Sequence, residues 1–286
     1  MIDKYENLSL GEERALYGIS NAKVKNCVFA GEADGESALK ETSHLSIDGC
    51  EFRLRYPMWH MSHSAVENSV LTDTCRAPLW YDDEIRLSAC TINGTKALRE
   101  CDRVTMEGCD VNSDEFGWFC RNLIWTNGKL KSQYPFLKST DMELSQFELN
   151  GKYSFQYVEN TRIIDSVLNT KDAFWHSKNV TVINSVVNGE YLGWYSENLK
   201  LVRCRIEGTQ PLCYAHGLVL ENCTMTGCDL SFEKSEVDAT VIGGIDSVKN
   251  PESGRITASS VGEVISEDGR ERRTELTVDG GLSRMI

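Results

Sequence analysis

The stretch "FWHSKNVTVINSVVNGEYLGWYSENLKLVRCRIEG", residues 174–208, decides the fold because it contains one pattern twice. Phe-Trp-His at 174–176 and Gly-Trp-Tyr at 193–195 stand 19 residues apart. After each come alternating apolar residues, then a small residue, then Asn-Gly or Glu-Gly. Self-similarity at a fixed period is the signature of a repeat protein.

The pattern extends along most of the chain. A convenient anchor is the residue, usually small, that follows each apolar run, and other positions are numbered relative to it. The anchors are Cys27, Cys50, Ser69, Cys90, Cys109, Gly128, Phe147, Ser166, Ser185, Cys204 and Cys223. From Cys90 onward, every gap between anchors is 19 residues. Positions −3 and +2 are apolar throughout, and Asn recurs at −6, −1 and +3, with Gly common at +4.

This pattern predicts the fold class. Apolar residues at −5, −3, 0 and +2, with polar residues between them, are typical of two short strands joined by a bend at −1. Three sets of Asn and Gly turn residues predict three short strands per repeat, because both residue types tolerate left-handed backbone angles. A coil this short buries its apolar face only by stacking on neighbours. We therefore predict an all-β fold, a single-stranded right-handed parallel β-helix of about 12 coils of about 19 residues. Leucine-rich repeats share the pattern L-x-L-x-x-C-x-I but lack a third Asn-marked turn.

The repeat also suggests the domain organisation. No linker interrupts residues 14–243, so we predict one β-helix domain over 1–286. Residues 1–13 are expected to cap one end. The 19-residue register is lost after residue 243, and 244–286 are interpreted as a C-terminal capping segment and tail.

Composition excludes several classes of function. The net charge of −13 disfavours binding to nucleic acid and to anionic membranes. The first residues lack the layout of a signal peptide, and no apolar run is long enough to span a bilayer. We therefore expect a cytoplasmic protein whose 11 cysteines are reduced and buried. No dinucleotide or phosphate-binding fingerprint occurs, so no cofactor is predicted.

The predicted third strand, at −12 to −8, carries aromatic residues in neighbouring rows. Successive side chains of a strand point to opposite faces, so rows −11, −10 and −9 cannot all lie in the core. One aromatic row should therefore line an outer face, where it is expected to bind an oligosaccharide. The alternative is a non-enzymatic scaffold whose aromatic face packs against another subunit or the chain's own tail. The candidate ligand-binding residues are Trp59, His60, Trp80, Tyr81, Trp118, Trp175, His176, Trp194 and Tyr195.

Evidence for catalysis in the sequence is weak. Polysaccharide hydrolysis needs carboxylates that flank the scissile bond, and the best candidates are Asp82, Asp83 and Glu84, which follow Trp80-Tyr81. Adjacent acids in a turn are more often solvated surface residues. His60 and His63 have metal-ligand spacing but lack a third ligand, so no metal site is predicted. Whether the protein is an enzyme stays open.

Several segments resemble an uncharacterised bacterial family of unknown function. They are GEERALYG (11–18), GESALKE (35–41), RYPMWH (55–60), RAPLWYDDE (76–84), FWHSKNVTVINS (174–185), GEYLGWYSENL (189–199) and DSVKNPESG (246–254). The resemblance implies a right-handed β-helix of the pectin-lyase-like group over nearly the whole chain. It implies no catalytic residues, because fold does not carry function.

Overall fold

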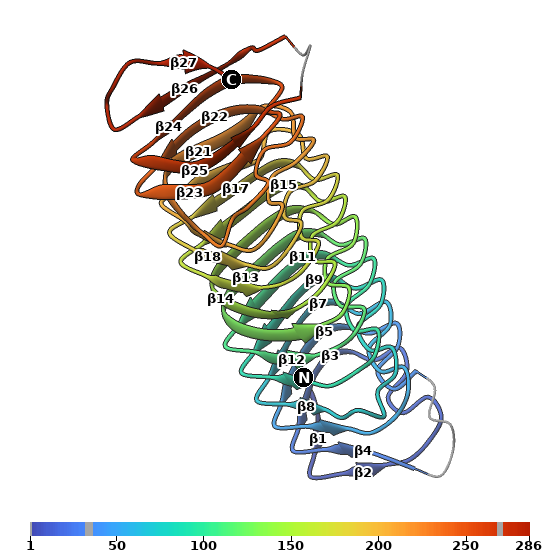
Figure 1. The fold of residues 1–286 in the computed structure, drawn as a ribbon. Helices are drawn as coiled ribbons and strands as arrows, with labels where there is room; N and C mark the ends of the chain where they lie inside the picture. The colour runs from blue at the N-terminus through green and yellow to red at the C-terminus, as the bar shows by residue number, and fades with distance from the viewer. Residues whose placement is uncertain (1, 32–36, 268–270) are drawn as a thin grey trace. The chain divides into compact units, whose positions relative to one another are not determined.

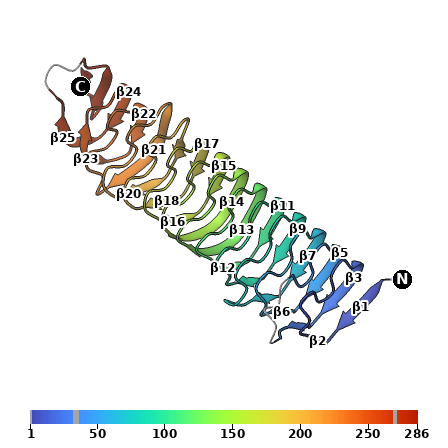
Figure 2. The ribbon, with the colours of Figure 1, turned by 90° about the vertical axis from the view of Figure 1, so that its right-hand side faces the viewer.

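A computed structural model describes residues 2–31, 37–267 and 271–286. The chain divides into two compact units, residues 1–147 and 148–286. In each unit, strands of successive coils lie side by side and pair in parallel (Figures 1 and 2). The predicted parallel β-helix is confirmed, and the described residues form about 14 turns rather than about 12. None of the described residues is helical, so the structure offers no helix suited to crossing a membrane.

In the first unit, each coil contributes one longer strand and one short strand. The longer strands are β1 (Asp3–Glu6), β3 (Ser20–Lys25), β5 (Ser43–Asp48), β7 (Ser62–Glu67), β9 (Asp83–Ser88) and β11 (Asp102–Glu107). The short strands are β2 (Ser9–Leu10), β4 (Val28–Phe29), β6 (Glu51–Phe52), β8 (Val70–Leu71), β10 (Thr91–Ile92) and β12 (Asp110–Asn112). In β13 (Arg121–Ser132) and β14 (Thr140–Gly151), the longer and the short strand of the coil are joined into one continuous strand. The boundary between the two units lies within β14.

The second unit repeats this arrangement. Its longer-side strands are β15 (Glu159–Ile164), β17 (Lys178–Ile183), β19 (Lys200–Val202), β21 (Leu218–Thr226), β22 (Glu236–Val241), β24 (Ser253–Ala258) and β26 (Thr274–Val278). The others are β16 (Val167–Asn169), β18 (Val186–Asn188), β20 (Arg205–Glu207), β23 (Gly244–Lys249), β25 (Ser260–Ile265) and β27 (Arg284–Met285). β23 and β25 form a separate parallel pair, and β27 pairs antiparallel with β26.

The strand register explains the 19-residue period. Ile85 pairs with Val104 and Val104 with Leu123, so equivalent residues of consecutive coils lie beside one another. In the second unit Val182 pairs with Leu201 in the same way. These side chains are buried, so inward positions form largely apolar rows through the core of each unit, interrupted by small polar residues such as Ser64 and Thr161.

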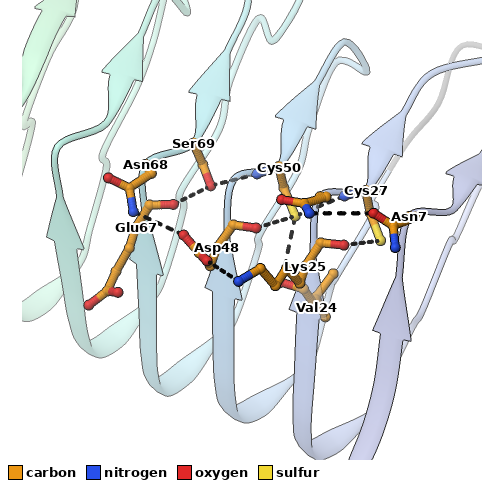
Figure 3. Close-up of polar contacts among 10 residues, drawn as sticks. Asn7, Val24, Lys25, Cys27, Asp48, Cys50, Glu67, Asn68 and Ser69 are labelled. Carbon is orange, nitrogen blue, oxygen red and sulfur yellow. Dashed lines mark hydrogen bonds and ion pairs between the residues drawn. The ribbon is translucent and has the colours of Figure 1, made fainter.

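The anchor residue stabilises the bend at −1. Asn26, Asn68 and their equivalents at −1 adopt left-handed backbone angles, as the Asn pattern predicts. Figure 3 shows the bend in the first coils: the thiol of Cys50 donates to the carbonyl of Asp48, two residues earlier, at 3.5 Å. The hydroxyl of Ser69 donates to the carbonyl of Glu67 at 2.7 Å in the same way. A small inward side chain with a donor therefore suits this position.

All 11 cysteines are free and buried, as predicted. Burial raises the pKa of the Cys50 thiol to about 11 and that of Cys75 to about 12. A thiol with a raised pKa is rarely a thiolate at neutral pH, so these two side chains are inert packing groups.

The third side of the coil is not the strand that the sequence predicts. Positions −11 and −9 both have positive φ, for example 58° at Met58 and 56° at His60. In the described part of the first unit, single-residue bridges join the residues at −10 of neighbouring coils, such as Trp59 with Trp80. Left-handed residues flank position −10 on both sides. The side chains at −11, −10 and −9 therefore do not alternate between the core and the solvent as they would in a regular strand. Row −11 is buried, while rows −10 and −9 both point outward.

The stacked coils reach further along the chain than residues 14–243. β1 and β2 pair in parallel with β3 and β4, so residues 3–10 form a coil of their own. In the second unit, β22, β24 and β26 continue the parallel pairing to Val278. The spacing departs from 19 residues only at the coils of β24 and β26, whereas β1 and β2 keep it relative to β3 and β4.

Candidate ligand-binding groove and aromatic rows

Indole rings form the inner of two outward aromatic rows in the first unit. Trp59 and Trp80 stack with ring centroids 5.0 Å apart and an interplanar angle of 1°. The next residue of the row is Arg99, whose Cζ lies 4.8 Å from the ring centroid of Trp80 and 4.6 Å from that of Trp118. The guanidinium therefore fills one position of an aromatic stack through cation–π contacts.

Each indole is also tied to the backbone. The Nε1–H of Trp59 donates to the carbonyl of Ala77 at 2.7 Å, and that of Trp80 to the carbonyl of Lys96 at 2.6 Å. In the second unit, Trp175 and Trp194 make the equivalent bonds to Tyr191 and Gln210. The indole donors are therefore occupied within the fold.

The outer aromatic row is exposed but also stacked. In the second unit, His176 lies between Tyr157 and Tyr195, with centroid distances of 4.9 and 5.0 Å. In the first unit, His60 stacks on Tyr81 at 4.9 Å. Neighbouring rings cover one another's faces, so both rows present mainly ring edges to solvent. The structure brings the predicted aromatic residues together, but it does not offer the ring faces on which sugars would stack.

The predicted acids do not converge. Asp82 is buried, with Oδ1 accepting the N–H of Met61 at 2.8 Å and Oδ2 lacking a partner. Burial raises the pKa of the Asp82 carboxyl well above its usual value. Asp83 and Glu84 instead lie on the outer side of β9, where each forms an ion pair with Arg103.

A groove of about 550 Å³ crosses the outer face of β3, β5, β7, β9 and β11 in the first unit. Its floor includes the short side chains of Ser46 and Ala65, at position −4. The lining residues are Ile2, Asn21, Ala22, Lys23, His44, Leu45, Ser46, His63, Ser64, Ala65, Glu84, Ile85, Arg86, Arg103 and Thr105.

Four connected side chains at position −6 stand along this groove. The rings of His44 and His63 stack at 4.9 Å, and Nδ1 of His63 lies 2.9 Å from Oε2 of Glu84. The same carboxylate oxygen lies 4.0 Å from Nε of Arg103. His60 belongs to the third side of its coil, so it does not join His63. Among the described residues, no three His, Cys, Asp or Glu side chains form a metal-binding group.

The backbone at these four residues is left-handed, with φ between 48° and 55°. The neighbouring coils place Asn21 and Asn122 at the same position, and Asn is a residue that tolerates this conformation. Glu and Arg adopt it at a higher cost, whereas His is among the residue types enriched there. The row thus departs from Asn where it borders the groove, and the backbone conformation does not account for that choice of side chains.

A family model described as "Protein of unknown function (DUF3737)" matches residues 3–279. The chain belongs to this family. A search of curated proteins by sequence gives no match.

Comparison with solved structures gives matches of different strength. One is a tailspike protein of E. coli bacteriophage HK620 in complex with a hexasaccharide, at 9% identity and a TM-score of 0.50. The match covers 90% of the chain but 61% of the tailspike chain, so the chain spans less than two thirds of that protein. The other is a periplasmic alginate epimerase, at 10% identity and a TM-score of 0.33, with 91% and 79% covered. The tailspike shares the β-helix fold of this DUF3737 protein.

The groove was missed from the sequence although a signal for it exists. The Asn row at −6 is visible at Asn122, Asn160, Asn179 and Asn198. When the earlier repeats are aligned on the same position, His44, His63, Glu84 and Arg103 fall in that row. The four coils in which Asn is replaced are the signal for the groove.

Proposed function

We propose that this DUF3737 protein binds an oligosaccharide in the groove across β3–β11. The observation that supports it best is the replacement of Asn by four functional side chains along a groove. The ligand site is thus moved from the aromatic rows, where the sequence suggested it, to the neighbouring outer face of the first unit.

The shape and lining of the groove suit a saccharide chain. The groove is open to solvent and crosses several strands, so it suits an extended ligand better than a small enclosed cofactor. Imidazole, carboxylate, guanidinium and hydroxyl groups recur along it at the strand spacing of about 4.8 Å. These donors and acceptors match the hydroxyl groups of successive sugar rings, and Ser46 and Ala65 leave room for them.

The test is to block the groove floor. Ala65 lies on the outer face of β7 and is only half-buried, so Ala65→Trp fills the groove without entering the core. Binding to a panel of neutral and acidic oligosaccharides should be lost. Thr181→Trp places the same side chain at position −4 of the second unit and should leave binding intact. Binding that survives Ala65→Trp, or an unmodified protein that binds nothing on the panel, would refute the proposal.

The exposed aromatic row of the second unit favours a second function, that of a scaffold with an oligomer interface. Tyr157 and Tyr195 are 46% and 44% exposed, and their ring edges form a continuous stripe with His176. Apolar stripes of this kind often mark contacts with protein. Sedimentation should then show self-association that Tyr195→Ser weakens, and a strict monomer at high concentration would contradict it.

A further inference from the structure

We infer that the saccharide bound in the groove is anionic, with negative groups that contact Lys23 and Arg86. This inference rests on the proposed function and names the ligand class of that same site. Its basis is the charge of the groove. Among the charged side chains that line the groove, Lys23, Arg86 and Arg103 are cationic and only Glu84 is anionic.

The single carboxylate of the lining is already engaged. Oε2 of Glu84 lies 2.9 Å from Nδ1 of His63 and 4.0 Å from Nε of Arg103. It therefore offers little repulsion to an incoming anion. The chain as a whole carries a net charge of −13, whereas the lining holds three cationic side chains and one carboxylate, with Asp83 and Glu107 paired to two of the cations from beside the groove. Such a contrast selects ligands by charge and guides them to the site.

Two of the cations are available to a ligand. Lys23 is exposed and has no ion pair among the described residues. Arg86 contacts Glu107 at 3.4 Å, but both side chains are about 60% exposed. Ion pairs of this kind contribute little in water and are readily exchanged for a ligand contact. Arg103 is less available to a ligand. It lies on β11 and forms ion pairs with Asp83 and Glu84 of β9.

The spacing of these two cations defines the length of the ligand. Lys23 pairs in register with Ser46, Ser46 with Ala65, and Ala65 with Arg86. Three strand spacings therefore separate Lys23 from Arg86, a distance of about 14 Å along the groove. The two positions between them carry short uncharged side chains. A monosaccharide cannot span both cations, whereas an oligosaccharide with several acidic groups can contact both.

The decisive experiment compares one oligosaccharide in two charge states by calorimetry. An oligogalacturonate of four residues is the anionic probe, and its fully methyl-esterified form is the neutral probe of the same length. Sulfated oligosaccharides and inorganic phosphate serve as further anions. We expect the acidic tetramer to bind more tightly than its ester, and its affinity to fall as salt screens the charges.

Substitutions then locate the contacts. Arg86→Gln and Lys23→Gln should each weaken binding of the acidic tetramer about fivefold and leave the ester unaffected. Both side chains are exposed, so the melting temperature should stay unchanged. Arg205→Gln is the matched control, since Arg205 is equally exposed on β20 and pairs with Glu207 outside the groove.

The outcomes separate this inference from the proposed function. Equal affinity for the tetramer and its ester, with Ala65→Trp removing both, would overturn the anionic ligand and retain saccharide binding. Phosphate binding as tightly as the tetramer would also overturn it, because the site would then recognise a simple anion. If no saccharide binds at all, both proposals fail.

Discussion

Position −6 of the coil has the same left-handed backbone in both units but carries different side chains. In the second unit it is occupied by Asn160, Asn179, Asn198 and Gly217, the residue types that tolerate this conformation best. In the first unit, four consecutive coils carry His, His, Glu and Arg instead. The backbone requirement is thus constant, so it cannot account for the choice of side chain in the first unit.

The hydrogen bonds of the two rows differ in the same way. In the second unit, Asn198 donates to Asn179 at 3.0 Å, and Asn179 donates to Asn160 at 3.1 Å. The amide of Asn179 therefore bonds to both neighbouring coils, which ties three coils together. In the first unit, the contacts of His63 and Glu84 join side chains that also face a groove. We interpret the Asn row as structural and the first-unit row as a binding surface.

The largest expected effect on stability concerns Asp82, at position −8. Asp82 holds a buried carboxyl with an unpartnered oxygen. At the same position of other coils, the hydroxyls of Thr42, Ser196 and Ser235 donate to backbone carbonyls at 2.9, 2.8 and 2.7 Å, although the hydroxyl of Ser177 has no partner among the described residues. Asp82→Ser should therefore increase the free energy of unfolding by about 1–3 kcal/mol at pH 7, because the unpaired group is removed.

The gain in the free energy of unfolding on Asp82→Ser should increase with pH. The folded-state pKa of Asp82 is raised, so the folded state retains this proton at pH values where the unfolded chain has released it. The contribution of Asp82 to stability therefore falls as pH rises above about 4, the carboxyl's unfolded pKa. Urea denaturation at pH 4 and pH 7 should show a larger gain for Asp82→Ser at pH 7. A gain independent of pH would show that the carboxyl is not protonated in the fold.

The next largest effect tests the Asn row of the second unit. Asn179→His removes hydrogen bonds to both neighbouring coils and places a less tolerant residue at φ 53°. We expect a loss of about 1–2 kcal/mol in the free energy of unfolding. Chemical denaturation measures it, with Lys178→Gln on the same strand as a control at an exposed position. A loss below about 0.5 kcal/mol would mean that the row is not structural.

Much of the fold could be predicted because its causes are local and repeated. The small anchor at Cys50 or Ser69 and the Asn bend before it recur at fixed spacing, so the sequence reveals both. The third side could not be predicted in this way. Bulky residues such as Met58 and Leu79 adopt left-handed angles there because the closed coil buries their side chains, and residue type gives no warning of it.

The candidate site was predicted less well than the fold. The sequence predicted that one aromatic row lies outside without deciding which one, and the stacking that covers the face of Trp80 depends on the coils on either side. Likewise, Asp82, Asp83 and Glu84 are adjacent in sequence, yet only the coil geometry sends the first into the core. The groove depends on residues that lie 19 or more positions apart, so it becomes visible only when whole repeats are compared.

The smallest expected effect on stability comes from the reciprocal exchange, His63→Asn. Asn is better suited to the left-handed backbone, which favours the variant, but the stack with His44 and the pair with Glu84 are lost. These contributions are of similar size, so the free energy of unfolding should change by less than about 0.5 kcal/mol. Oligosaccharide binding should nevertheless weaken strongly, because His63 stands at the centre of the groove. Denaturation and calorimetry on the same preparation measure both quantities. A variant as destabilised as Asn179→His, or one that binds normally, would show that the two rows serve the same structural purpose.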